Sequence, residues 1–217
     1  MKTRALRSAA WPRCLHGIAA TTLSSSTFES LRSGAMRGLR ADGAGANPMV
    51  HLGLIETVSH DPLCWAILQT CRFVRDCGPQ ERVEQVMAHI VQGISATPAN
   101  SITHTLCSRL QVLGWHIDEL GHVHDVLGSF SLFGVSAPEL QYRVEMQWPK
   151  VVAAATAHRR CFQGLEMRSP SDTRQWLRTL DTADQALFRK VLNGSHITQD
   201  GKTHCDETAT RSEEHTS

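Results

Sequence analysis

The chain has 217 residues, of which 41% are hydrophobic, and 22 Lys or Arg balance 21 Asp or Glu to give a net charge of +1. No apolar stretch approaches the about 18 residues that a membrane-spanning helix needs, which excludes a transmembrane protein. The composition is that of a globular protein and excludes a collagen-like repeat, a fully disordered chain and a strongly basic nucleic-acid module. A chain of this length can form one or two domains.

The N-terminal 40 residues are locally basic, with seven basic side chains and one acidic. The sequence does not favour a secretory signal peptide, because charged residues and Pro12 interrupt the apolar stretch that follows Lys2. The basic, Ser/Thr-rich composition fits either a cleaved organelle transit peptide or the basic face of a folded segment. We favour the folded segment, because Trp11-Pro12 and Phe28 are typical of a protein core.

Seven cysteines, an odd number at low density, favour reduced thiols over a disulfide framework. We therefore expect an intracellular protein, in the nucleus or the cytoplasm, that is not secreted and has no membrane partner.

Apolar residues at spacings of three and four predict several helices in the first half of the chain. Asp61-Pro62, an N-cap residue followed by proline, marks one helix start, and glycines close three of these segments. The Gly-rich segment 42–48 is the best candidate for a domain boundary. The predicted helices cover residues 26–39, 61–78, 79–93 and 98–114.

The second half contains the only strand signals. Residues 115–118 and 122–126 alternate around a glycine-containing turn at 119–121, which predicts a β-hairpin, and residues 129–133 supply a candidate third strand. Pro149 is expected to kink or divide a helix over 136–155, since proline cannot donate the backbone hydrogen bond. Two short helices follow, over 170–180 and from a Thr182 cap to 193. The predicted fold class is mainly α, with bundle-like helical segments and one small β-hairpin at about residues 115–133.

Histidines in the hairpin are the first candidate site. His122 and His124 lie two residues apart on a strand and therefore face the same side, which suits metal coordination. His116 or Asp125 would complete a cluster. No third ligand at a recognised spacing accompanies them, so we favour an exposed polar hairpin face and assign no metal ligand.

Cysteines are the second candidate. Cys64, Cys71 and Cys77 fall on or just after one predicted helix, but their spacing matches no zinc signature, so we interpret them as small core residues. A Cys/His nucleophilic pair stays open. The sequence has no phosphate-binding glycine loop, no dinucleotide fingerprint, no zinc-protease or serine-hydrolase motif, no Cys-x-x-Cys and no Asp-Asp pair to hold two catalytic metal ions.

Several phrases, in order along the chain, resemble the region downstream of the polymerase core in non-LTR retrotransposon polyproteins, particularly those of some protist genomes. They span nearly the whole chain up to about Thr210. The phrases are ALRSAAWP (5–12) with LHG (15–17), NP (47–48) with HLGL (51–54), SRLQ (108–111) with LGWH (113–116), DTRQWLR (172–178), and QAL (185–187) with RKVLNGSHIT (189–198).

This resemblance implies a domain organisation. Residues 1–45 would be a basic thumb-like segment, and residues 46–210 a helical connection domain with the hairpin. Residues 211–217, RSEEHTS, match the translation of a common sequencing adapter and are interpreted as an artefact tail. The family's Phe/Tyr-x-Asp-Asp palm motif would precede Met1, and its zinc knuckle would follow Thr210.

The resemblance also implies a function. We expect a non-catalytic fragment of an RNA-directed DNA polymerase polyprotein, with no catalytic residue, no metal ligand and no cofactor of its own; divalent metal ions and the knuckle zinc would belong to the missing parts. RNA or DNA is the expected partner, through phosphate contacts at Arg4, Arg7 and Arg13. The alternatives are a free-standing helical protein-interaction module and a small metal or cysteine enzyme.

Overall fold

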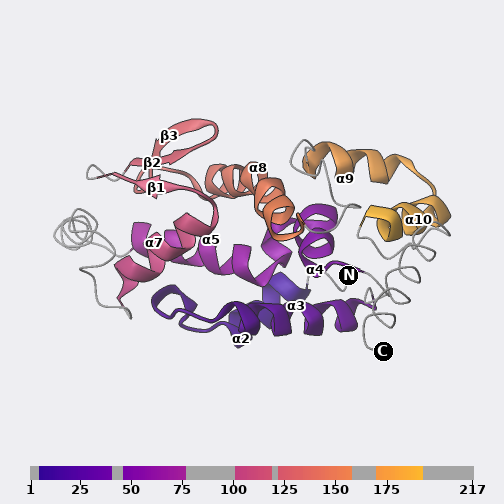
Figure 1. Cartoon of the computed structure of the whole chain (residues 1–217), viewed down its shortest axis with the longest axis horizontal. Helices are drawn as coiled ribbons and strands as arrows, with labels where there is room; N and C mark the ends of the chain where they lie inside the picture. The colour runs from indigo at the N-terminus through magenta and orange to yellow at the C-terminus, as the bar shows by residue number, and fades with distance from the viewer. Residues whose placement is uncertain (1–4, 41–45, 77–100, 119–121, 158–169, 193–217) are drawn as a thin grey trace, which may run out of the picture.

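A computed structural model describes residues 5–40, 46–76, 101–118, 122–157 and 170–192. It is mainly helical with one small antiparallel sheet, which confirms the predicted fold class (Figure 1). The elements are a π-helical turn η1 (Leu6–Ala10), α2 (Trp11–Cys14), a 3-10 turn η2 (Ile18–Ala20), α3 (Ser25–Leu39), α4 (Pro48–Val50), a π-helical turn η3 (His51–Glu56), a 3-10 turn η4 (Val58–His60), α5 (Pro62–Arg75), α7 (Ile102–Val112), β1 (His116–Ile117), β2 (His122–Asp125), β3 (Gly128–Ser131), α8 (Ala137–Ala155), α9 (Pro170–Thr179) and α10 (Thr182–Leu192).

Side-chain caps determine where most of these helices begin. Asp61 caps α5 as predicted, because its carboxylate accepts hydrogen bonds from the first free backbone N–H groups. Ser101 and Ser136 do the same for α7 and α8, so α7 begins at Ile102. The predicted cap at Thr182 is wrong: Asp181 Oδ1 accepts from the backbone N–H of Ala183 and Asp184, each at 2.9 Å, and Thr182 is already helical.

The structure also differs from the sequence predictions at Pro149 and in two short helical stretches. Of the two outcomes predicted at Pro149, a kink or a division, the division is wrong: α8 runs through this buried proline as one helix. The short turns between residues 6 and 20 and between 48 and 60 were not predicted, since they are too short to show a helical period. The predicted helix 79–93 lies outside the described residues. Within the described ranges, no helix is both long and apolar enough to cross a membrane.

The sheet has the strand order β1-β2-β3, with both pairs antiparallel. His116 is paired with His124 and Ile117 with Val123, so the predicted hairpin is present and residues 129–131 form the third strand. Val123 and Phe130 on the inner face are buried, whereas the histidines lie on the other face and are partly or fully exposed.

Helix α5 lies at the centre of the fold, between α3 on one side and α8 on the other (Figure 1). Its buried residues contribute to two hydrophobic clusters. The larger cluster joins α5 to α7, the sheet and α8, and the fully buried indole of Trp148 belongs to it. Gly53 makes room for that indole, since a Cβ at this position would overlap the Trp148 ring.

The second cluster crosses the boundary predicted near residue 45. Trp11, Phe28 and Met36 from the N-terminal segment pack with Leu52 and Trp65 from the following part. Residues 41–45 lie outside the described residues, and the division into domains at 45 stays a prediction. The two sides of that boundary nevertheless share one core.

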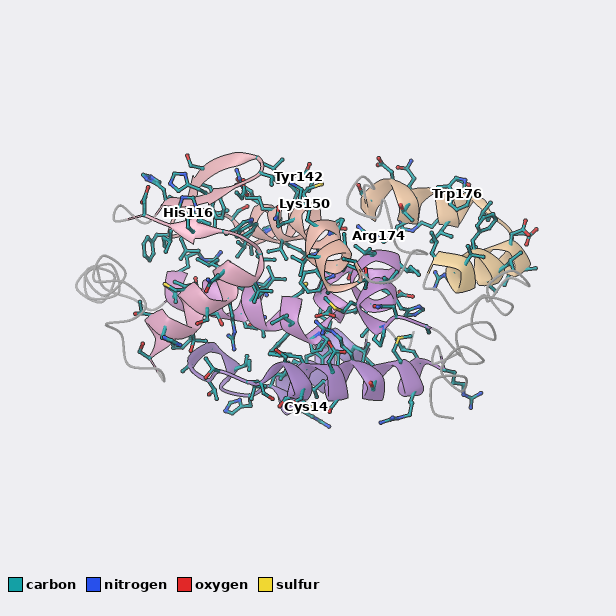
Figure 2. All side chains as sticks on the ribbon, viewed as in Figure 1. Cys14, His116, Tyr142, Lys150, Arg174 and Trp176 are labelled. Carbon is teal, nitrogen blue, oxygen red and sulfur yellow. The ribbon has the colours of Figure 1, made fainter. Side chains whose placement is uncertain are left out.

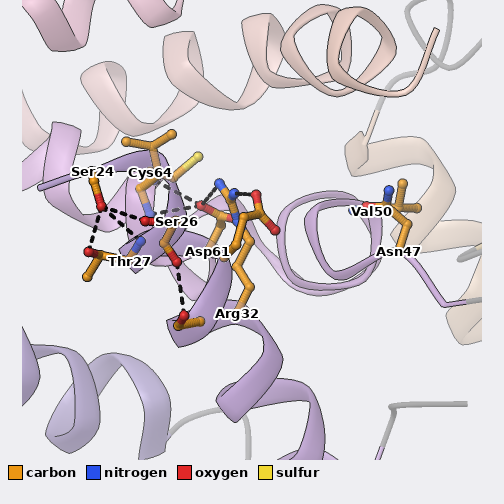
Figure 3. Close-up of polar contacts among 11 residues, drawn as sticks. Ser24, Ser26, Thr27, Arg32, Asn47, Val50, Asp61 and Cys64 are labelled. Atoms are coloured by element: carbon orange, nitrogen blue, oxygen red, sulfur yellow. Dashed lines mark hydrogen bonds and ion pairs between the residues drawn. The ribbon is translucent and has the colours of Figure 1, made fainter. Parts of the chain in front are cut away.

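A buried ion pair fastens the same two parts together (Figure 3). Arg32 on α3 donates from Nε to Asp61 Oδ2 at 2.6 Å and from Nη2 to Oδ1 at 3.1 Å. Asp61 is fully buried and Arg32 is 3% exposed. The carboxylate thus serves both the guanidinium and the N-terminus of α5, whose Leu63 N–H donates to it at 2.9 Å. Buried charges of this kind are tolerated only when fully paired.

Replacing Asp61 with alanine should destabilise the fold strongly. The change removes the α5 cap and the buried partner of Arg32, which keeps only the exposed Glu29. Breaking a buried pair from one side typically costs about 3–5 kcal/mol. The free energy of unfolding, measured by urea titration with far-ultraviolet circular dichroism, should fall by roughly that amount.

Glu29→Ala is the matched control. Glu29 also pairs with Arg32, at 2.6 Å, but its side chain is 55% exposed, so its loss should cost at most about 1 kcal/mol. Equal effects of the two substitutions would contradict the role given to Asp61.

Candidate functional site

The described residues line a groove of about 1290 Å³. Its walls come from three places: the segment of η1, α2 and η2, the middle and end of α5, and the start of α8. Tyr142, which lines the groove from α8, is labelled in Figure 2. The volume exceeds the about 300–1,000 Å³ of typical small-molecule pockets, so the groove can accommodate part of a polymer.

Aromatic side chains line this groove at different depths. Trp65 is 9% exposed and lies at the base, whereas Phe73 and Tyr142 are 44% and 53% exposed. Phe73 belongs to α5 and Tyr142 to α8, so the two exposed rings are supplied by separate helices. A single exposed ring is ordinary, but several aromatic rings lining one groove are typical of a binding site.

The charges of the groove favour an anion. Asp76 and Glu145 line it, but Asp76 is paired with Arg75 at 2.8 Å and Glu145 with Arg174. Hydrogen bonding from the Arg75 guanidinium holds the pKa of Asp76 below its usual value, so this carboxylate stays ionised and paired at neutral pH.

Two arginines of the groove, Arg7 and Arg72, are outside these ion pairs, although the positive charge of Arg72 also lowers the pKa of Asp76. Arg7 and Arg72 form no ion pair with any carboxylate of the described residues, and the buried Nε of Arg72 has no hydrogen-bond partner among them. Burial lowers the pKa of the nearby His60, and the positive charges of Arg7 and Arg174 lower it further. The charges of Arg7 and Arg174 thus both act on His60, which follows the groove residue Ser59.

The structure separates the three arginines named from the sequence. Arg7 lines the groove, and Arg13 is exposed on α2 but does not line it. Arg4 lies outside the described residues. Sequence analysis missed Arg72, Phe73 and Tyr142. The one available signal was Phe73, a large apolar residue that falls outside the buried stripe of α5.

The hairpin histidines do come together, as their spacing predicted. His116 is labelled in Figure 2. The rings of His116 and His124 stack with centroids 4.6 Å apart, and His124 Nε2 lies 3.1 Å from Asp118 Oδ2. His122 Nδ1 lies 3.7 Å from the same oxygen. Asp125 does not join them, because it pairs instead with Arg143 at 2.9 Å. Among the described residues, no three side chains are arranged to hold a metal ion.

The described cysteines are Cys14, Cys64, Cys71 and Cys107, and all four are free. Cys64 and Cys71 are buried in the larger cluster, which confirms their interpretation as core residues, whereas Cys77 lies outside the described residues. Burial raises the pKa of the Cys71 thiol to about 12 and raises that of Cys64 as well. A protonated, enclosed thiol is a poor nucleophile, so the geometry does not support a Cys/His enzyme at these two positions.

No protein-family model, curated protein or solved structure matches this chain. The groove and the residues that line it are therefore the features that point to a function.

Thiol labelling tests the assignment of the cysteines. Iodoacetamide at mildly alkaline pH should label the exposed Cys14 rapidly and spare Cys64 and Cys71 while the protein is folded, because only accessible thiolates react. Peptide mass spectrometry identifies the modified positions, and a urea-unfolded sample is the control in which all three are labelled. Rapid labelling of Cys64 or Cys71 in the folded protein would contradict their burial.

Proposed function

We propose that this chain is a non-catalytic, nucleic-acid-binding fragment of a retrotransposon RNA-directed DNA polymerase polyprotein. The observation that carries the binding function is the groove, in which two unpaired arginines lie with two half-exposed aromatic rings. The sequence phrases shared with non-LTR elements support the parent protein.

Phosphate neutralisation supplies the affinity in this proposal. Arginine contacts release counterions from a polynucleotide, which makes binding sensitive to salt. Arg7 and Arg72 are suited to this role because neither forms an ion pair with a carboxylate of the described residues. The aromatic rings add contacts to bases or sugars.

The proposal leaves the chemistry to other parts of the parent polyprotein. The divalent metal ions would belong to the palm and the zinc to the knuckle, and this fragment would act in the nucleus or the cytoplasm. The four free cysteines of the described residues agree with a reducing compartment.

One observation favours a second candidate function, a protein-interaction module. Trp176 on α9 and Leu187 and Val191 on α10 are each 45–48% exposed. Leu187 and Val191 lie four residues apart and share one face of α10. The Trp176 ring packs edge-to-face on Phe188 at 4.8 Å, which fixes the two helices against each other.

Replacing Arg7 with alanine should weaken nucleic-acid binding. Fluorescence anisotropy of the full chain with a labelled RNA should show a several-fold loss of affinity and a fall of about one in the slope of log K against log salt, because one phosphate contact is removed. Arg13→Ala is the matched control, an exposed arginine on the neighbouring helix that does not line the groove, and its affinity should be unchanged. Equal effects of the two substitutions would remove the groove from the binding site.

The full chain should also show no metal-dependent nucleotide incorporation on a primed RNA template. The proposal assigns the acidic metal-binding centre to the missing palm, so addition of Mg²⁺ or Mn²⁺ should not produce extension. Extension of the primer by the purified chain would contradict the non-catalytic assignment.

A further inference from the structure

We infer that the groove selects a single-stranded polynucleotide over a duplex, by stacking unpaired bases on Phe73 and Tyr142. This inference rests on the proposed function and adds to it the structural class of nucleic acid that is bound. The supporting observation is that both exposed aromatic rings and arginine side chains line the same groove.

The two exposed rings are placed to receive bases. Phe73 comes from α5 and Tyr142 from α8, and the pairing of Asp76 with Arg75 and of Glu145 with Arg174 leaves neither lining carboxylate as an unpaired charge beside them. Base–aromatic stacking is tolerant of sequence, because every base presents a π face. In a duplex those faces are already stacked on neighbouring pairs, and exposing one costs energy. Exposed aromatic rings therefore bind a single strand, whose bases are unpaired, more tightly than a duplex.

The cations are placed to receive the backbone of the same strand. Arg7 lies on the wall formed by η1, and Arg72 lies next to Phe73 on α5. The groove thus offers phosphate-binding and base-binding groups together, the combination found where single strands are held without sequence preference. Its volume, about 1290 Å³, exceeds that of a typical small-molecule site and leaves space for more than one nucleotide.

A partner protein is the competing occupant of such a surface. The unpaired Arg7 and Arg72 argue for a polyanion instead, because burying them under an apolar partner would desolvate two cations without compensation.

The test compares a labelled uridine oligomer of about 15 nucleotides with the same oligomer annealed to its adenosine complement. Anisotropy with the full chain should show binding to the single strand at least about tenfold tighter than to the duplex. Tyr142→Ala and Phe73→Ala should each weaken single-strand binding by roughly 5- to 100-fold and leave the weaker duplex binding unchanged. Tyr142→Phe should bind like the unsubstituted chain, because the ring and not the hydroxyl makes the contact.

Trp176→Ala is the matched control, since Trp176 is 45% exposed but does not line the groove. Its single-strand affinity should be unchanged, and circular dichroism should show that every variant is folded. Equal binding of single strand and duplex, with no effect of Tyr142→Ala or Phe73→Ala, would overturn this inference and leave nucleic-acid binding standing. Absence of binding to both probes would overturn the inference and the proposed function together.

Discussion

The buried carboxylate of Asp61 connects the N-terminus of α5 to Arg32 on α3. It is enclosed completely, it caps the central helix α5, and it holds the guanidinium of Arg32 on α3 with both of its oxygens. The Trp11 indole donates to the carbonyl of His60, immediately before Asp61, at 3.1 Å. These polar contacts join the N-terminal segment to the start of α5 and act together with the hydrophobic cluster that the two parts share. A charge enclosed in this way is tolerated only with its partners in place.

The groove depends on that attachment. One of its walls is the N-terminal segment and another is α5, so the position of Arg7 relative to Arg72 and Phe73 follows from how α3 and α2 are held against α5. The pairing of both lining carboxylates with outlying arginines then leaves a surplus of positive charge around the exposed rings. The contact between the N-terminal segment and α5 thus contributes to the stability of the fold and also shapes the proposed binding groove, through different side chains.

Periodicity and capping predicted the long elements from the sequence. Asp61-Pro62 located the start of α5, and alternation around residues 119–121 located the hairpin. The π-helical and 3-10 turns were missed, because stretches of three to six residues show no period. The groove was largely missed for a different reason. Its residues come from segments far apart in the chain, and only tertiary packing shows that Phe73 and Tyr142 face the same space as Arg7.

Residues before 41 and after 45 share one hydrophobic core, which limits the sequences that could replace the N-terminal segment during evolution. Leu52 and Trp65 are covered by Trp11, Phe28 and Met36. A recombination event that replaced the first 40 residues with those of a distant relative would place side chains of other shapes against Leu52 and Trp65. The close packing of this core would be lost. Substitutions on the two sides of residues 41–45 should therefore have accumulated in step, and residues before 41 and after 45 should be inherited as one unit.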